Sequence, residues 1–198
     1  MKICFAASSG GHFEQLMMLK PLMEKYESFV VTEKTGYEVK TPVKCYYLQQ
    51  VNRRQWRCLF YLLKNTVDSL RLLHKEQPDV VVCTGVLAMI PLCMEAKLSG
   101  RKLIYIESFA KVTSATLTGK LLYHYADRFY VQWTQMKEIY PDAICLGRIN
   151  KDDICNDRIS EVPVQSIVTK DRSADRGRHD KRGGVCPDRS QRLSAKAL

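Results

Sequence analysis

Apolar positions along the chain form short continuous runs that alternate with longer segments of helical pattern. The short runs are rich in β-branched and aromatic residues, as expected for strands of a sheet that is covered on both faces. The predicted strands are Lys2–Ala7, Ser28–Thr32, Lys44–Leu48, Asp79–Thr84, Lys102–Glu107, Arg128–Trp133 and Ala143–Leu146. The predicted helices are His12–Tyr26, Gln55–Glu76, Ala88–Leu98, Thr118–Tyr125 and Thr134–Ile139.

This alternation predicts an α/β fold, in which an open parallel sheet carries helices on both faces. In such sheets ligands bind at the carboxyl ends of the strands, so the loops that follow the strands are the expected sites of chemistry. The pattern stops near Asn150, and apolar periodicity ends after Val168. We therefore predict one domain over residues 1–149 and a disordered or loosely attached tail over residues 150–198.

Basic residues outnumber acidic ones along the whole chain. The 198 residues include 31 Lys and Arg against 21 Asp and Glu, a net charge of +10. Residues 1–149 alone hold 20 basic and 13 acidic side chains. This excess suits an anionic partner such as phosphate, an anionic membrane surface or nucleic acid. Nucleic acid is the weakest of these, because the basic residues are scattered and no recognition motif is present.

The sequence context of the eight cysteines favours a reducing compartment, in which they remain free thiols. Cys4, Cys83 and Cys145 lie inside apolar runs, where a thiol acts as a small hydrophobic group. No C-x-x-C pair supports a zinc site, and the N-terminus is predicted to be a strand and a turn rather than a signal peptide. No apolar stretch approaches the roughly 18 to 20 residues that span a bilayer. We expect a cytoplasmic protein that uses no metal or cofactor and contacts membranes peripherally.

The loop after the first strand is the first candidate site. Its residues are Ser8, Ser9, Gly10, Gly11 and His12. Two glycines allow close approach of a ligand, and the following helix start offers free N–H groups suited to phosphate. The alternative is a tight turn in which a serine caps the helix, and the spacing supports both interpretations equally. The loop matches neither the dinucleotide-binding glycine pattern nor the P-loop.

Two further loops are predicted to reach the same edge of the sheet. Thr84 and Gly85 end the fourth apolar run, and Glu107 ends the fifth. A carboxylate at this edge can accept a hydrogen bond from a sugar hydroxyl or act as a general base. The alternative for Glu107 is an exposed or capping residue, which is the commoner role of an isolated glutamate.

The segment from Asn52 to Glu76 is predicted to be a basic amphipathic helix. Its apolar side carries Trp56, Phe60, Leu63, Val67 and Leu70. Its basic residues are Arg53, Arg54, Arg57, Lys64 and Arg71. Such a helix can lie on an anionic bilayer, while a core-packing helix with a solvated basic face is the slightly favoured alternative for most of its length. The start of the helix, with Arg53, Arg54, Trp56, Arg57 and Phe60, is the predicted membrane-proximal part.

Several segments in this order resemble a known family. They are SSGGHFEQL, RRQWR, KEQPDVVVCTGV, GRKLIYIESFAKVTSATLTGKLLYHYADRFYVQW and YPDAICLG, which together extend from about residue 1 to 147. The chain resembles the PssD/CpsF-type proteins of bacterial capsule and exopolysaccharide synthesis. These are relatives of the membrane-anchoring subunit of the asparagine-linked glycosylation N-acetylglucosaminyltransferase.

The resemblance implies a Rossmann-like lobe, namely the N-terminal, acceptor-side half of a GT-B glycosyltransferase that is split into two chains. A small companion subunit would supply the lobe that binds the nucleotide-sugar. The implied acceptor is a polyprenyl-diphosphate-linked glycan, and the implied location is the inner face of the cell membrane. By position, Ser8 to His12 face the cleft between the lobes and Glu107 matches its carboxylate, so His12 and Glu107 are the candidate catalytic residues. The rival interpretation is a non-catalytic scaffold that activates a partner glycosyltransferase at the membrane.

The unusual tail suggests a further hypothesis. With permissive synonymous codons, a reading frame that starts inside the codons of Asp152 and Asp153 reads MIFVTIGSQKFQF, which resembles the start of the companion subunit. Residues after about 150 are then a frameshifted read-through into the downstream partner gene. Sequencing the locus tests this, because the absence of an ATG in the shifted frame would rule it out.

Overall fold

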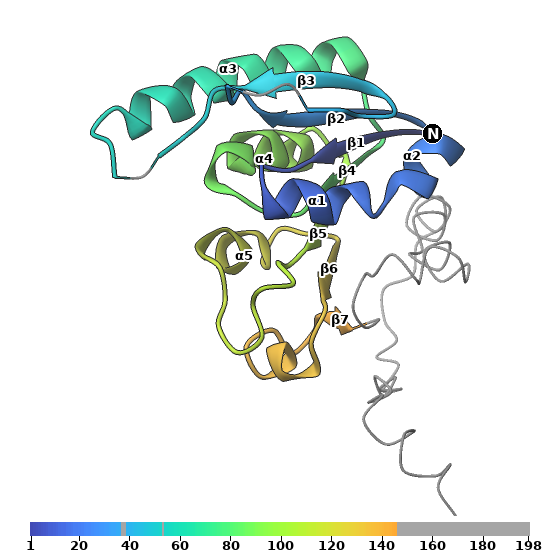
Figure 1. The fold of residues 1–198 in the computed structure, drawn as a ribbon, viewed down its shortest axis with the longest axis vertical. Helices are drawn as coiled ribbons and strands as arrows, with labels where there is room; N and C mark the ends of the chain where they lie inside the picture. Colours follow the sequence, from blue (N-terminus) through green and yellow to red (C-terminus); the bar gives the residue numbers. More distant parts are fainter. Residues whose placement is uncertain (37–38, 53, 146–198) are drawn as a thin grey trace, which may run out of the picture.

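A computed structural model describes residues 1–36, 39–52 and 54–145 of the chain. Seven strands form one parallel sheet in the order β3-β2-β1-β4-β5-β6-β7 (Figure 1). The strands are β1 Lys2–Ala6, β2 Glu27–Glu33, β3 Lys44–Leu48, β4 Val80–Cys83, β5 Lys102–Ile106, β6 Arg128–Val131 and β7 Ile144–Cys145. The predicted α/β class with an open parallel sheet is therefore confirmed.

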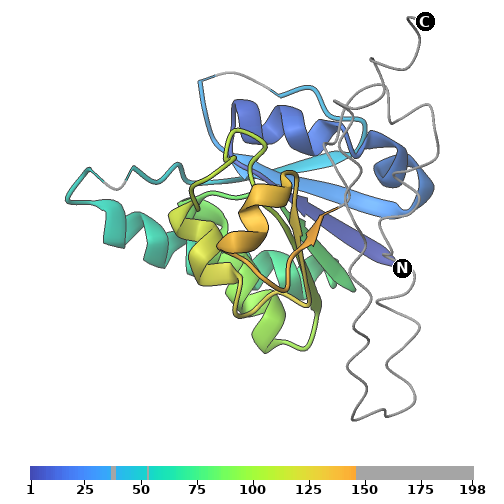
Figure 2. The ribbon, with the colours of Figure 1, turned by 90° about the horizontal axis from the view of Figure 1, so that it is seen from below.

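Helices cover both faces of this sheet (Figure 2). Helices α1 and α2 lie on one face, and α3, α4 and α5 lie on the other. The helices are α1 Gly11–Met17, α2 Lys20–Lys25, α3 Cys58–Glu76, α4 Ile90–Leu98 and α5 Leu117–Leu122, with 3-10 turns at Leu87–Met89 and Thr134–Glu138. The sheet is thus the middle layer of three.

Alternate residues of each strand supply two separate apolar cores. In β1, Ile3 and Phe5 join the core under α1 and α2, whereas Cys4 and Ala6 join the core under α3, α4 and α5. All four side chains are fully buried. Successive side chains of a strand point to opposite faces, so continuous apolar runs are required when both faces are covered.

The strand order places a topological switch between β1 and β4. The chain runs outward from β1 through β2 to β3, returns to β4 beside β1, and then runs outward the other way. Such a switch opens a crevice at the carboxyl ends of the two central strands. The loops that carry His12 and Thr84 leave the sheet at this point.

The observed helices differ from the predicted bounds, most clearly in two places. The segment His12–Tyr26 forms two helices, α1 and α2, because Pro21 in the first turn of α2 has no N–H to donate to the preceding turn. Helix α3 begins at Cys58 rather than Gln55, because turns closed by Gln55 N to Asn52 O and Cys58 N to Gln55 O precede it. The predicted tail, residues 150–198, lies outside the described residues.

Candidate functional site

The His12 side chain is held at the carboxyl edge of the sheet by the neighbouring β4 loop. Its Nδ1 atom lies 2.7 Å from the backbone oxygen of Thr84. In return, the buried Thr84 hydroxyl donates to the backbone oxygen of His12 at 3.0 Å. This pair of contacts joins the loops after β1 and β4, so the prediction that they share one edge is confirmed.

The contact with Thr84 determines which ring nitrogen of His12 carries the hydrogen. A backbone oxygen can only accept a hydrogen bond, so Nδ1 must be the donor. In the neutral ring, Nε2 then keeps its lone pair and can accept a proton. Since the pocket described below is lined by His12, this geometry suits a general base.

The turn after β4 brings backbone unusually close to the His12 ring. Gly85 has φ +116°, and a Cβ atom there would lie 3.1 Å from Cε1 of His12. Val86 also has a positive φ, of 98°, which is rare for a β-branched residue. Backbone strain of this kind is concentrated at functional sites. The strained turn therefore packs directly against the candidate base.

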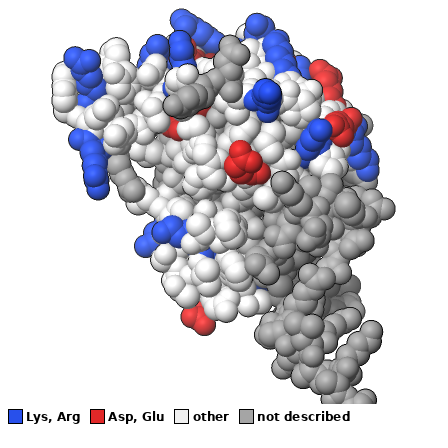
Figure 3. All heavy atoms as spheres, in the orientation of Figure 1, with Lys and Arg blue, Asp and Glu red and all other residues white. Residues whose placement is uncertain are grey.

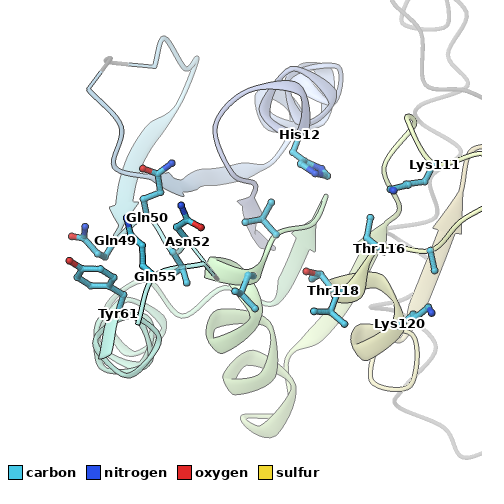
Figure 4. A pocket seen from close by; sticks show the side chains of 15 residues that line it. His12, Gln49, Gln50, Asn52, Gln55, Tyr61, Lys111, Thr116, Thr118 and Lys120 are labelled. Atoms are coloured by element: carbon cyan, nitrogen blue, oxygen red, sulfur yellow. The ribbon is translucent and has the colours of Figure 1, made fainter. Parts of the chain in front are cut away.

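A pocket of about 790 Å³ opens beside His12. In Figure 4, His12 lies between two groups of side chains that face each other across this space. One wall follows β3 and carries the amide side chains of Gln49, Gln50, Asn52 and Gln55 together with Tyr61. The opposite wall carries Lys111, Thr116, Thr118 and Lys120 around the start of α5. An amide-rich wall thus faces a wall with two cations.

Buried polar side chains of neighbouring elements hold the backbone of the amide wall in place. Asn65, which is fully buried in α3, accepts from the Gln49 backbone N at 2.9 Å and donates to the Gln49 backbone oxygen at 2.8 Å. Glu33 at the end of β2 accepts from the Val51 backbone N at 3.4 Å. Burial raises the pKa of the Glu33 carboxyl group. The backbone of the wall is therefore anchored to α3 and β2.

The Glu107 carboxylate lies beneath the other wall, with only 1% of the residue exposed. Its Oε1 accepts from the Ser108 backbone N at 2.9 Å and from the Thr116 hydroxyl at 3.0 Å. Its Oε2 accepts from the Tyr140 hydroxyl at 3.1 Å and from the Thr116 backbone N at 3.4 Å. Burial, and then the charge of Glu107, raise the pKa of Tyr140. The alternative that Glu107 is an exposed residue is therefore wrong.

Residues that sequence reasoning left without a role hold the loop after Glu107. The buried amides of Gln15 and Gln132 both donate to the backbone oxygen of Glu107, at 3.2 and 3.1 Å. Trp133 Nε1 donates to the backbone oxygen of Phe109 at 2.7 Å. The only signal in the sequence was the occurrence of polar residues next to apolar ones.

The other predicted residues of the glycine-rich loop lie beside the pocket rather than on its lining. The Ser8 hydroxyl is buried and donates to the Ser9 backbone oxygen at 3.2 Å. Gly10 has φ +82° and its oxygen accepts from Phe13 and Glu14, while Gly11 begins α1. The phosphate-binding role of Ser8, Ser9, Gly10, Gly11, Thr84 and Gly85 stays a prediction.

Helix α3 exposes the apolar side for which packing against the core was the slightly favoured alternative over most of its length. The exposed apolar residues have exposed fractions from 46% to 87%; they are Trp56 just before the helix and Leu59, Phe60, Leu63, Val67 and Leu70 within it. The buried side of the helix consists instead of Asn65, Ser69, Leu72 and Leu73. The core-packing interpretation of that apolar side is therefore wrong, because another side of the helix faces the core and the start of α3 also extends past the edge of the sheet (Figure 1).

Basic side chains flank this exposed apolar stripe. Arg54, Arg57, Lys64 and Arg71 are all exposed, and Arg53 lies outside the described residues. Figure 3 shows Lys and Arg along the edge formed by α3 and at its projecting end. The Arg57 guanidinium lies 5.0 Å from the centre of the Trp56 ring. The combination of exposed apolar and basic residues is typical of interfacial helices.

Within the described residues, no three His, Cys, Asp or Glu side chains come together as a metal site. Over the same part of the chain, no helix combines the length and the apolar character that a bilayer span requires.

Residues 3–149 match the family described as "Oligosaccharide biosynthesis protein Alg14 like". The chain is 31% identical over 177 residues to the UDP-N-acetylglucosamine transferase subunit ALG14 of Rattus norvegicus, covering 74% of this chain and 82% of the relative. It is 36% identical over 116 residues to the human protein of the same name, covering 52% and 54%. These matches agree with the expected relationship to the asparagine-linked glycosylation subunit.

Two solved structures share the fold at low identity. Acinetobacter baumannii MurG superposes with a TM-score of 0.55 at 19% identity, covering 66% of this chain and 40% of that chain. The UDP-GlcNAc 2-epimerase of Neisseria meningitidis superposes with a TM-score of 0.59 at 11% identity, covering 84% and 52%. This chain thus corresponds to about half of each of these proteins, and the Rossmann-like lobe is confirmed.

Proposed function

Since the chain belongs to the Alg14-like family of oligosaccharide biosynthesis proteins, we propose that it is the acceptor-binding and membrane-recruiting subunit of a two-chain glycosyltransferase. The companion subunit supplies the lobe that binds the nucleotide-sugar. The acceptor is a polyprenyl-diphosphate-linked glycan, in capsular or exopolysaccharide synthesis on the cytoplasmic face of the membrane.

The observation that carries this proposal is the His12–Thr84 contact, which orients a side chain that lines the pocket. Nε2 of His12 accepts the proton of the acceptor hydroxyl while that oxygen attacks the anomeric carbon of the donor sugar. The bond from the anomeric carbon to the nucleoside diphosphate breaks, and the leaving group departs with the electron pair. Attack from the side opposite the leaving group inverts the configuration at that carbon. Donors on the companion subunit stabilise the charge of the leaving diphosphate.

The two walls of the pocket suit the two parts of the acceptor. Amide side chains such as Gln49, Asn52 and Gln55 both donate and accept, which matches sugar hydroxyl groups. Lys111 and Lys120 on the opposite wall provide positive charge for the diphosphate. His12 lies between these two walls, which supports a role in positioning and activating an acceptor hydroxyl.

The exposed stripe on α3 supports membrane recruitment. The start of this helix extends past the edge of the sheet (Figure 1), and Gln55 and Tyr61 near that start line the pocket. A lipid-linked acceptor remains in the bilayer, so its binding site must lie near the membrane surface. Trp56 and Phe60 would enter the interface, while Arg54 and Arg57 contact anionic headgroups.

Sugar transfer tests the proposal directly. The full chain and the companion subunit are purified separately and together, and transfer from a labelled nucleotide-sugar to a polyprenyl-diphosphate glycan is measured. We expect transfer only when both chains are present. Full activity of the companion alone, unchanged by this chain, would overturn the proposal.

A non-catalytic scaffold is the second candidate, favoured by the buried and fully hydrogen-bonded state of Glu107. In that case this lobe would recruit and activate the companion without touching the reacting atoms. His12→Ala distinguishes the two functions in the assembled complex. Loss of turnover with retained assembly indicates the catalytic role, whereas normal turnover indicates the scaffold.

A further inference from the structure

We propose that Glu107 is a positioning residue that sets the cationic wall of the pocket, and that it does not accept the proton of the acceptor. The kinetic part of this inference rests on the proposed function, whereas its structural part concerns this chain alone. The residues that hold this wall in place are Glu107, Thr116 and Gly119.

The hydrogen bonds of Glu107 leave it poorly suited to be a base. An ionised carboxylate has about four lone-pair sites. Four donors point at Glu107, namely the backbone N–H groups of Ser108 and Thr116 and the hydroxyls of Thr116 and Tyr140. The residue is also 1% exposed. A base must accept a proton from the substrate, and in this arrangement all four sites are occupied by the protein.

Thr116 links the Glu107 carboxylate to the start of helix α5. Its hydroxyl group donates to the Glu107 carboxylate and accepts from the Gly119 backbone N at 2.9 Å. The latter contact is the N-terminal cap of α5. Thr116, Leu117, Thr118 and Lys120 all line the pocket. Glu107 therefore fixes the cap, and the cap fixes the wall that presents Lys120.

Gly119 shows how closely the atoms around the Glu107 carboxylate are packed. A Cβ atom at this position would overlap Oε2 of Glu107 and would lie 2.8 Å from Thr116 Oγ1 and from the Tyr140 hydroxyl oxygen. Gly119→Ala would therefore push the carboxylate away from its partners without changing its chemistry. This substitution separates the position of Glu107 from its ability to ionise.

Steady-state kinetics of the full chain with its companion subunit tests the inference. Glu107→Gln, Thr116→Val and Gly119→Ala are each expected to raise KM for the acceptor by about fivefold to tenfold, with kcat within about threefold of the wild type. The pH profile of kcat should not move. Thr116→Ser keeps the hydroxyl group, so its KM for the acceptor should stay near that of the wild type. Gly36→Ala is the matched control, because nothing lies within 4 Å of its added Cβ atom.

A different pattern would overturn the inference. If Glu107 were the base, Glu107→Gln would lower kcat by about 100-fold or more and abolish one limb of the pH profile, while Thr116→Val would not. Loss of kcat in Glu107→Gln alone therefore contradicts a positioning role.

Hydrogen exchange provides a test that needs neither acceptor nor companion. The amides of Ser108, Thr116 and Gly119 donate to this cluster, and they are expected to exchange about tenfold faster in Glu107→Gln. The amides of β1 serve as the internal reference. Unchanged exchange at Thr116 and Gly119 would overturn the inference even if transfer activity is found. Faster exchange without any transfer activity would instead refute the proposed function and leave the positioning role intact.

Discussion

The His12 ring and the backbone oxygen of Thr84 lie 2.7 Å apart across the two central strands of the sheet. The contact requires the strained turn that follows Thr84, in which both Gly85 and Val86 have positive φ. The orientation of the candidate base therefore depends on the backbone of a different loop.

Gly85→Ala is expected to displace the His12 ring. The added Cβ would lie 3.1 Å from Cε1 of His12, and the positive φ of Gly85 adds a backbone cost of about 1 kcal/mol. We expect kcat of the assembled enzyme to fall at least tenfold. Gly100→Ala is the matched control, since Gly100 also has a positive φ, of 76°, but nothing lies within 4 Å of its Cβ position.

Both glycine variants should lose similar stability in urea unfolding, while only Gly85→Ala loses turnover. Equal losses of turnover in the two variants would show that backbone strain alone is responsible. Normal turnover in Gly85→Ala would contradict the role of His12 orientation.

Replacement of the exposed apolar residues at the start of α3 is expected to weaken membrane binding. The paired change Trp56→Ala and Phe60→Ala removes apolar surface from residues that are 87% and 66% exposed. Binding to vesicles that contain anionic lipid should fall about tenfold or more, because the removed side chains would otherwise be buried in the interface. The free energy of unfolding should change by less than about 0.5 kcal/mol per residue.

Leu98→Ala is the matched control for vesicle binding, because Leu98 is 82% exposed at the end of α4. A similar loss of binding in this variant would indicate nonspecific adsorption. Charge reversal at Arg54 and Arg57 should reduce binding further at low salt and less at high salt.

The sequence predicted the elements that carry the strongest apolar runs. The segment VVVC of β4 is continuous and β-branched, and its position in a buried parallel strand follows from that pattern. Because parallel strands end at the same edge, the sequence also predicted that the loops of His12 and Thr84 share one edge, whereas their direct contact depends on β1 and β4 being neighbours in the sheet.

Other parts of the site depend on contacts that no local pattern encodes. Lys111 and Lys120 lie near loops whose polar residues have no periodic signal, so their place in the pocket follows only from the packing of α5. Gln15 and Gln132 meet at Glu107 although they are more than 100 residues apart in the sequence. Helix α3 has apolar residues on two sides, and periodicity alone could not decide which side is buried.

Acid is expected to weaken the junction between β1, β3 and the end of α3. The Glu76 carboxylate lies 2.6 Å from Lys2 Nζ and 3.1 Å from Lys44 Nζ, and it accepts from the Tyr46 hydroxyl. The hydrogen bond from Lys2 is the main reason that its pKa is lowered from 4.5 to about 2. A lowered pKa gives stability that is present above pH 4.5 and is lost as the pH falls through about 2.

Glu76→Gln should therefore lower the free energy of unfolding by about 1 to 2 kcal/mol at pH 7, and by progressively less below pH 4. Urea titrations of both proteins between pH 2 and 7 measure the difference. A difference that does not depend on pH would show that packing, rather than charge, explains the effect.

Glu95 in α4 is expected to have the opposite pH dependence. The residue is 8% exposed, and neither oxygen of its carboxyl group has a hydrogen-bond partner among the described residues. Burial raises the pKa of Glu95 from 4.5 to about 7. The folded state therefore holds this proton more tightly than the unfolded state, so stability is greatest below pH 4.5 and is lost as the pH rises through about 7.

Glu95→Gln removes the charge at every pH and keeps a similar shape. We expect it to raise the free energy of unfolding by about 1 to 2 kcal/mol at pH 8 and to have little effect at pH 4. Urea unfolding at both pH values measures the change, with Glu138→Gln as the control at an exposed position. The expected destabilisation comes from burying the charged carboxylate. Equal effects of Glu95→Gln at the two pH values would therefore contradict this account.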